Sequence, residues 1–151
     1  MKTTMKAAIL LLSGTIFFSQ ASLAGPKADR TGPPADPCKL VVTDPKAACT
    51  SEIGYAFDWL GNANAAGVFD TKNGEKNYIG LTCKLALSQA KMEDQKAEDA
   101  YYKLSDSEVK VDTLLDQGKL INTGDDQKEV IKQLQINLKK AADCAYKEAF
   151  E

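Results

Sequence analysis

Apolar residues recur at spacings of three and four along most of the chain after residue 44, which is the period of a helix with one buried face. The first run has Asp44 as a candidate cap and Pro45 at the first helical position, where proline is tolerated. Three further runs extend from about Asn77 to Asp94, from about Gln95 to Gln117, and onward from about Asp125. No stretch between them alternates like a strand, so the sequence predicts an all-α fold.

Two glycines, Gly67 and Gly118, mark the ends of the first and third runs. Each is followed within three residues by large apolar side chains, namely Val68 and Phe69 after the first and Leu120 and Ile121 after the second. Glycine readily takes the left-handed conformation that ends many helices, and an apolar residue beyond it folds back onto the last turn.

The pattern therefore predicts turns at Gly67–Glu75 and Gly118–Asp125 and an up-down antiparallel bundle of three or four helices. Whether the second and third runs form one helix or two stays open at this point. The residues from 93 to 96 are polar, but they include no glycine or proline that would enforce a break.

The start of the chain has the organisation of a secretory signal peptide. Lys2 and Lys6 precede an apolar run at 7–18, and small residues lead up to a cleavage point after Ala24. The run is too short to span a bilayer, and no cysteine follows it closely, so neither a membrane span nor a lipid anchor is expected. The predicted location is periplasmic or secreted.

Residues 25–37 are expected to form a flexible leader. They hold four of the five prolines and no large apolar side chain, so they cannot bury enough surface to offset the entropy lost on ordering. The helical domain is then expected to occupy residues 38–151.

The four cysteines all lie in that domain, and an even number in a small exported domain predicts two disulfides. Four cysteines allow three pairings, of which the bundle geometry favours Cys49–Cys144 and Cys38–Cys83. In an up-down bundle the first helix begins at the end where the fourth finishes, whereas Cys83 lies nearer the other end, within reach of an irregular segment from Cys38. No short C-x₂₋₄-C spacing suggests zinc.

Composition removes several function classes. The chain has no histidine, which excludes Ser-His-Asp and Cys-His catalysis and imidazole metal ligands. No nucleotide-binding glycine motif occurs, and the loop at 70–75 places Lys72 where a calcium loop needs an oxygen ligand. We therefore expect no cofactor and no metal. A net charge of −2 gives no electrostatic footprint for nucleic acid or an anionic membrane.

Several short motifs lie, in chain order, on the predicted helices or at their ends. They are Gly67 with Phe69, Lys84-Leu85 with Ala90, Asp99-Ala100 with Lys103-Leu104, Val111 with Leu114, Gly118 to Leu120, and Ala141, Ala142 and Cys144. In these motifs the segment from about Ile53 to Tyr146 resembles the FIMAH-type and related small helical domains of bacterial secreted and surface proteins. The resemblance implies a compact helical domain without a catalytic centre, often an accessory to another protein, and it carries over no functional residues.

Together these features predict an exported, non-catalytic binding module with a protein or glycan partner and an accessory, inhibitory or assembly role. The candidate contact residues are four aromatic side chains expected to form one edge: Tyr55 and Trp59 on the first helix, Tyr101 and Tyr102 on the third. For Trp59, packing at the margin of the core is the favoured role and contact with a partner is the alternative.

A small carboxylate-dependent hydrolase is the alternative function. Adjacent acidic residues occur at Glu93-Asp94 and at Asp125-Asp126. A glycosidase needs two carboxylates held across a cleft at a defined separation, which spacing along a helix cannot establish. In an acidic helical protein such pairs are more typical of helix caps and solvated faces.

Overall fold

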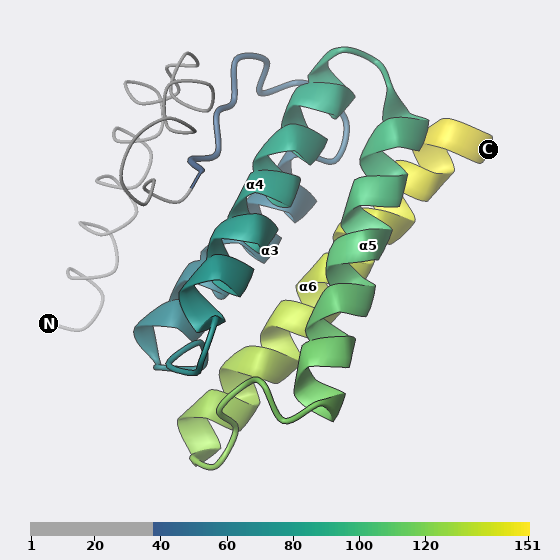
Figure 1. Ribbon diagram of the computed structural model, residues 1–151. Coiled ribbons are helices and arrows are strands. Elements are labelled where there is room, and N and C mark those ends of the chain that lie inside the picture. The colour runs from purple at the N-terminus through teal and green to yellow at the C-terminus, as the bar shows by residue number, and fades with distance from the viewer. Residues whose placement is uncertain (1–37) are drawn as a thin grey trace, which may run out of the picture.

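Four α-helices follow one another along residues 38–151, the part of the chain that the computed structural model describes (Figure 1). They are α3 (Thr50–Ala65), α4 (Gly74–Glu93), α5 (Ala97–Asp116) and α6 (Asp125–Phe150). Within these residues there is no strand, and no helix is long and apolar enough to cross a membrane. The predicted signal peptide and the leader at 25–37 lie outside the described residues.

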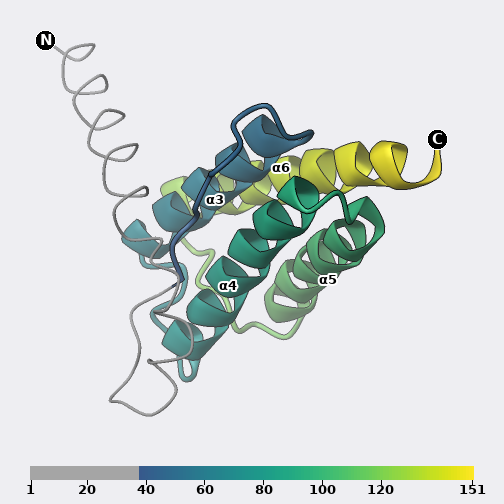
Figure 2. The same ribbon diagram turned by 90° about the horizontal axis from the view of Figure 1, so that it is seen from above.

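Each helix runs antiparallel to the one before it, and the four form a closed ring. Helix α3 packs against α4 and α6, and α5 packs against the same two helices, so α3 and α5 lie diagonally across the bundle (Figures 1 and 2). The predicted all-α, up-down architecture is confirmed, and the number of helices in this part of the chain is four.

The core lies where the apolar stripes of the four helices meet. Leu60, Leu104 and Leu134, from three different helices, are completely buried. Burying a leucine of this kind contributes about 1.5–3 kcal/mol. Alanines occupy several other buried positions and let the helices approach closely, as at Ala100 and Ala141. The helical period in the sequence thus identified the buried faces of α3, α5 and α6. On α4 the stripe expected at Ile79, Cys83, Ala86 and Ala90 is wrong: Ala90 is exposed and the other three are only half-buried, and the buried face includes Leu81, Leu85 and Met92.

Helices α3 and α5 both end at a left-handed glycine, as predicted. Gly67 has a φ of 79° and Gly118 a φ of 66°. At each end the next residue reaches back to the helix: the N–H of Val68 donates to the carbonyl of Ala63 at 3.1 Å, and that of Lys119 donates to Leu114 at 2.8 Å. This hydrogen-bond pattern is the Schellman motif, and it satisfies carbonyls that would otherwise lack partners.

The two glycine turns lie at the same end of the bundle and are joined to each other (Figure 1). The N–H of Ile121 donates to the carbonyl of Val68 at 2.9 Å. Gln127, in the first turn of α6, accepts from the N–H of Gly124 and donates to the carbonyl of Ala66, both at 3.1 Å. These contacts fix the start of α6 against the end of α3.

The question of one helix or two between residues 77 and 117 is answered by a break at Gln95. This residue has a φ of 59°, and the N–H of Lys96 donates to the carbonyl of Lys91 at 2.8 Å. Helix α4 therefore ends in the same motif as α3 and α5, with glutamine in place of glycine. As a result α5 begins at Ala97 and not at Gln95.

The predicted start of the first helix at Pro45 is wrong. The Asp44 carboxylate accepts the N–H of Lys46 at 3.0 Å, and its carbonyl accepts the N–H of Ala47 at 3.1 Å, so Pro45 lies in a separate turn. Aspartate commonly stabilises such turns through its own side chain. Helix α3 begins after Cys49, which has a φ of 65°.

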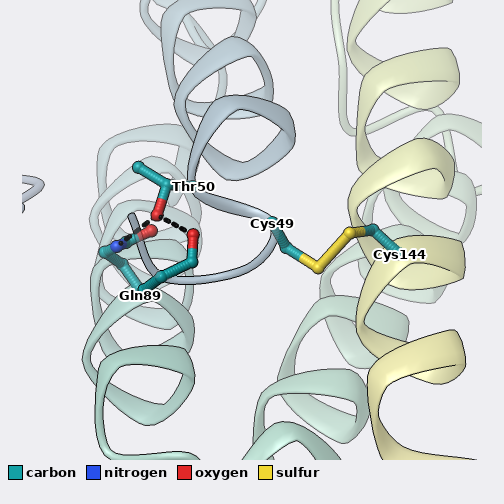
Figure 3. Close-up of a disulfide and its surroundings, with 5 residues drawn as sticks. Cys49, Thr50, Gln89 and Cys144 are labelled. Atoms are coloured by element: carbon teal, nitrogen blue, oxygen red, sulfur yellow. Dashed lines mark hydrogen bonds between the residues drawn. A yellow bond between two sulfur atoms is a disulfide. The ribbon is translucent and has the colours of Figure 1, made fainter. Parts of the chain in front are cut away.

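Residues 38–49, which we term the strap, lie alongside α4 and are fixed by both disulfides. Cys38 bonds to Cys83 in α4, and Cys49 bonds to Cys144 in α6. These are the two pairs that the bundle geometry favours. Beside Cys49, the hydroxyl of Thr50 accepts a hydrogen bond at 3.1 Å from Gln89 of α4 (Figure 3). The first turn of α3 is therefore tied to α4 on one side and to α6 on the other.

Candidate binding surface

The four aromatic residues nominated from the sequence do not form one edge. Tyr55 and Trp59 lie on α3, and Tyr101 and Tyr102 lie on α5, which is the diagonal helix (Figure 2). Among residues 38–151 no ring contact joins the two pairs. The sequence could not show this, because the order of the helices around the bundle is a tertiary property.

On α3 the two aromatic side chains have different surroundings. Trp59 is half-buried and packs against the hydrophobic core, which is the role that the sequence favours for it. Tyr55 is 60% exposed and has no aromatic neighbour among the described residues. An isolated exposed tyrosine gives little area for a partner to bury.

On α5 the two tyrosines belong to a larger group, which we term the aromatic cluster: Tyr101, Tyr102, Tyr146 and Phe150. The ring of Tyr101 lies 5.3 Å from that of Tyr102, 5.4 Å from Tyr146 and 5.8 Å from Phe150, measured between centroids. The rings of Tyr146 and Phe150 are 4.9 Å apart. These separations, with tilted or edge-on rings, are those that aromatic pairs favour.

The antiparallel order of α5 and α6 creates this cluster. The first turns of α5 lie beside the last turns of α6, so residues about 45 positions apart in sequence meet (Figure 1). Tyr146 and Phe150 are four residues apart and thus share one face of α6. That spacing was the available signal for them, and the sequence reasoning missed it.

The cluster is anchored on its inner side and open on its outer side. Tyr101 packs against the core and touches the other three rings. In contrast, Tyr102 is 54% exposed, and Tyr146 and Phe150 are each 46% exposed. The cluster therefore presents several large, pre-positioned rings to solvent at one place.

Comparison with known proteins adds no relative: no protein-family model, no curated protein and no solved structure matches the chain. The resemblance to FIMAH-type domains consequently stays a prediction, and the functional inference rests on the surface itself.

The acidic residues considered for catalysis lie apart and have structural surroundings. Glu93 accepts hydrogen bonds from the N–H groups of Thr43 and Asp44, at 3.0 to 3.1 Å, and from the Thr43 hydroxyl. Burial alone would raise the pKa of Glu93, but these bonds, with one from Gln89, lower it overall. Glu93 thus ties the strap to the end of α4.

The other adjacent pair, Asp125 and Asp126, lies exposed in the first turn of α6, where the carboxylates complement the helix dipole. Two further carboxylates have a pKa above the ordinary value. Burial raises the pKa of Asp58. Burial also raises the pKa of Glu108; the positive charge of Lys139 opposes this shift, and the negative charges of Asp112 and Asp143 add to it. Within residues 38–151 no group of three or more His, Cys, Asp or Glu residues is arranged to hold a metal ion.

Proposed function

We propose that this protein is an exported, non-catalytic helical module that binds a protein or glycan partner in an accessory, inhibitory or assembly role. The aromatic cluster is the observation that supports the proposal. Large, rigid tyrosine and phenylalanine rings supply contact area at a low cost in conformational entropy, which is why such residues dominate binding energies at interfaces.

The aromatic cluster includes more exposed rings than the packing of α5 against α6 requires. Tyr101 alone is placed to make that connection, because it is half-buried and touches both rings of α6. Tyr102 lies on the outer side, is more than half exposed and contacts only Tyr101 among the rings of the cluster. A soluble domain gains little stability from an exposed ring in that position, whereas a partner would bury it.

Export is the second part of the proposal. Two disulfides indicate an oxidising compartment, since such bonds persist in the periplasm or outside the cell and are rare in the cytosol. The signal-like start of the sequence agrees with this location. N-terminal sequencing of the mature protein should find Gly25 as its first residue, and retention of Met1 would contradict the assignment.

Capture from the native extract tests the binding function. The chain supplies a matched control, because Tyr55 and Tyr102 are both exposed tyrosines but only Tyr102 belongs to the cluster. Tyr102→Ser should weaken capture of the partner by about tenfold, as expected for loss of an interface anchor. Tyr55→Ser should leave capture unchanged.

Circular dichroism must first show equal helicity for the three proteins. Equal capture by wild type and by Tyr102→Ser would contradict the proposed surface. Hydrolysis of a glycan or peptide by the purified domain, abolished by a single carboxylate substitution, would contradict the non-catalytic assignment and favour the hydrolase.

A further inference from the structure

Charged residues around the aromatic cluster distinguish it from a neutral patch. On α5, Tyr102 follows Glu98 by four residues and precedes Asp106 by four, so both carboxylates lie next to its ring on the same helix face. Both are exposed. Neither is in an ion pair within the described part of the chain, so both are open to an incoming cation.

The cations nearby offset this negative charge only in part. Lys91 is paired with Asp99, with its Nζ 3.5 Å from the carboxylate. Lys103 follows Tyr102 directly, so it lies a little over a quarter turn around α5, toward the buried Ala100 and Ser107. The exposed Lys110 follows Asp106 by four residues and so lies beyond that carboxylate, away from Tyr102. Lys147 is the one lysine adjacent in sequence to a ring of the cluster on α6. Next to Tyr102 on α5, the unpaired carboxylates of Glu98 and Asp106 therefore outnumber the one adjacent lysine, Lys103, and the surface is aromatic with a local excess of negative charge.

Aromatic rings and carboxylates together are the chemistry that recognises an organic cation. The faces of the rings attract a Lys or Arg side chain through their quadrupoles, and the carboxylates attract it by charge. The rings also cover the apolar stem of a long basic side chain, which leaves only its charged head in water. A neutral glycan would use the rings and could donate hydroxyl hydrogen bonds to Glu98 and Asp106, but it would gain no charge attraction from them.

We propose that the aromatic cluster, with Glu98 and Asp106, binds a basic, lysine- or arginine-bearing segment of a partner protein. This inference rests on the proposed function and adds the chemical class of the partner. Tyr102 acts as the aromatic platform, and Glu98 and Asp106 act as the anionic rim.

The test uses a synthetic peptide in which lysine and arginine alternate with glycine and serine. A neutral counterpart replaces them with acetyl-lysine and citrulline. Titration of the isotope-labelled protein, followed by NMR, should show saturable shifts at residues 98–106 and 143–150 with the basic peptide only. Binding should weaken as salt increases, because the contact is at the exposed surface.

Substitutions then separate the two components. Glu98→Gln/Asp106→Asn should weaken peptide binding by about tenfold at low salt, and Tyr102→Leu should weaken it by about two- to fivefold, as expected for lost charge pairing and lost cation–π attraction. The matched control Glu75→Gln/Asp116→Asn removes the same two types of charge at the opposite end of the bundle. It should bind like wild type.

Three outcomes would overturn the inference: equal binding of the neutral peptide, equal binding by Glu98→Gln/Asp106→Asn, or no shift at the cluster with the basic peptide. Shifts at the cluster with N-acetylglucosamine oligomers, but not with the basic peptide, would assign a glycan instead. In each of these cases the proposed function still stands if Tyr102→Ser loses capture from the native extract, and it falls separately if capture is unchanged.

Discussion

Residue Gln95 takes the backbone conformation that Gly67 and Gly118 take at the ends of the neighbouring helices. All three lie at the position after the helix cap, with φ between 59° and 79°. A side chain there costs about 1 kcal/mol relative to glycine, because its Cβ approaches the following carbonyl. The end of α4 is therefore less stable locally than the ends of α3 and α5.

Replacing Gln95 by glycine should remove this conformational cost, and replacing Gly118 by glutamine should introduce it. Gln95→Gly should stabilise the domain by about 0.5–1 kcal/mol, and Gly118→Gln should destabilise it by about 1 kcal/mol or more. Gly118 suits the comparison because, apart from its two chain neighbours, a Cβ there would meet no atom within 4 Å, so only the backbone conformation is tested. Urea unfolding measures both. A destabilised Gln95→Gly variant would show that its side chain has a role that the conformational argument omits.

The Glu93 carboxylate makes the attachment of the strap depend on pH. Its pKa is lowered from the ordinary value of 4.5 in the folded protein, so its contribution to stability is complete above that value. As the pH falls through the lowered pKa, the carboxylate takes up a proton and the contribution is lost.

Unfolding of wild type and Glu93→Gln from about pH 7 to about pH 3 should show this loss. The variant should be less stable at neutral pH, and the difference should shrink in acid. Asp58 and Glu108 act in the opposite direction, since burial raises the pKa of each, and for this reason the difference between the two proteins is the informative quantity. A difference that stays constant across the range would contradict the role of Glu93.

At the scale of the elements, the apolar stripes hold the bundle together. Leu104 of α5 and Leu134 of α6 have no exposed surface and lie in the middle of their helices. Truncating either one to alanine removes buried methyl groups and leaves a cavity, so Leu104→Ala and Leu134→Ala should each cost about 2–5 kcal/mol.

Chemical denaturation measures this loss, and Val109→Ala is a control on the same helix, because Val109 is 60% exposed. It should change stability by no more than about 0.5 kcal/mol. Losses of that small size at both leucines would mean that the core does not depend on these stripes.

At the scale of the whole molecule, the two disulfides covalently connect segments that lie far apart in the sequence. Cys49–Cys144 joins the start of α3 to the last part of α6, across a sequence separation of 95, and Cys38–Cys83 joins the strap to α4 across a separation of 45. Closing a longer loop restricts the unfolded chain more, so the first bond should contribute somewhat more stability than the second.

Cys49→Ala/Cys144→Ala should therefore destabilise the domain by about 2–5 kcal/mol while its helical circular dichroism is retained. Cys38→Ala/Cys83→Ala is the comparison and should cost slightly less. If the free energy of unfolding of Cys49→Ala/Cys144→Ala fell by less than about 0.5 kcal/mol, the prediction would be contradicted. Recovery of a Cys38–Cys49 peptide from the unreduced wild type would contradict the pairing itself.

The sequence by itself determined the all-α class, the buried faces of α3, α5 and α6, and the helix ends at Gly67 and Gly118. Each of these follows from local properties, namely the period of the apolar residues and the freedom of glycine to take a positive φ. The disulfide pairs also followed, because an up-down order places the start of the first helix beside the end of the last one.

Only the tertiary structure decided the break at Gln95, the start of α3 and the membership of the aromatic cluster. Gln95 and Pro45 carry local signals that permit more than one conformation, and packing selects among them. Tyr101 meets Tyr146 because α5 and α6 are adjacent, and it is separated from Trp59 because α3 is diagonal to α5. Which residues share a surface depends on how the helices are arranged around the core, and no spacing along a single helix encodes that arrangement.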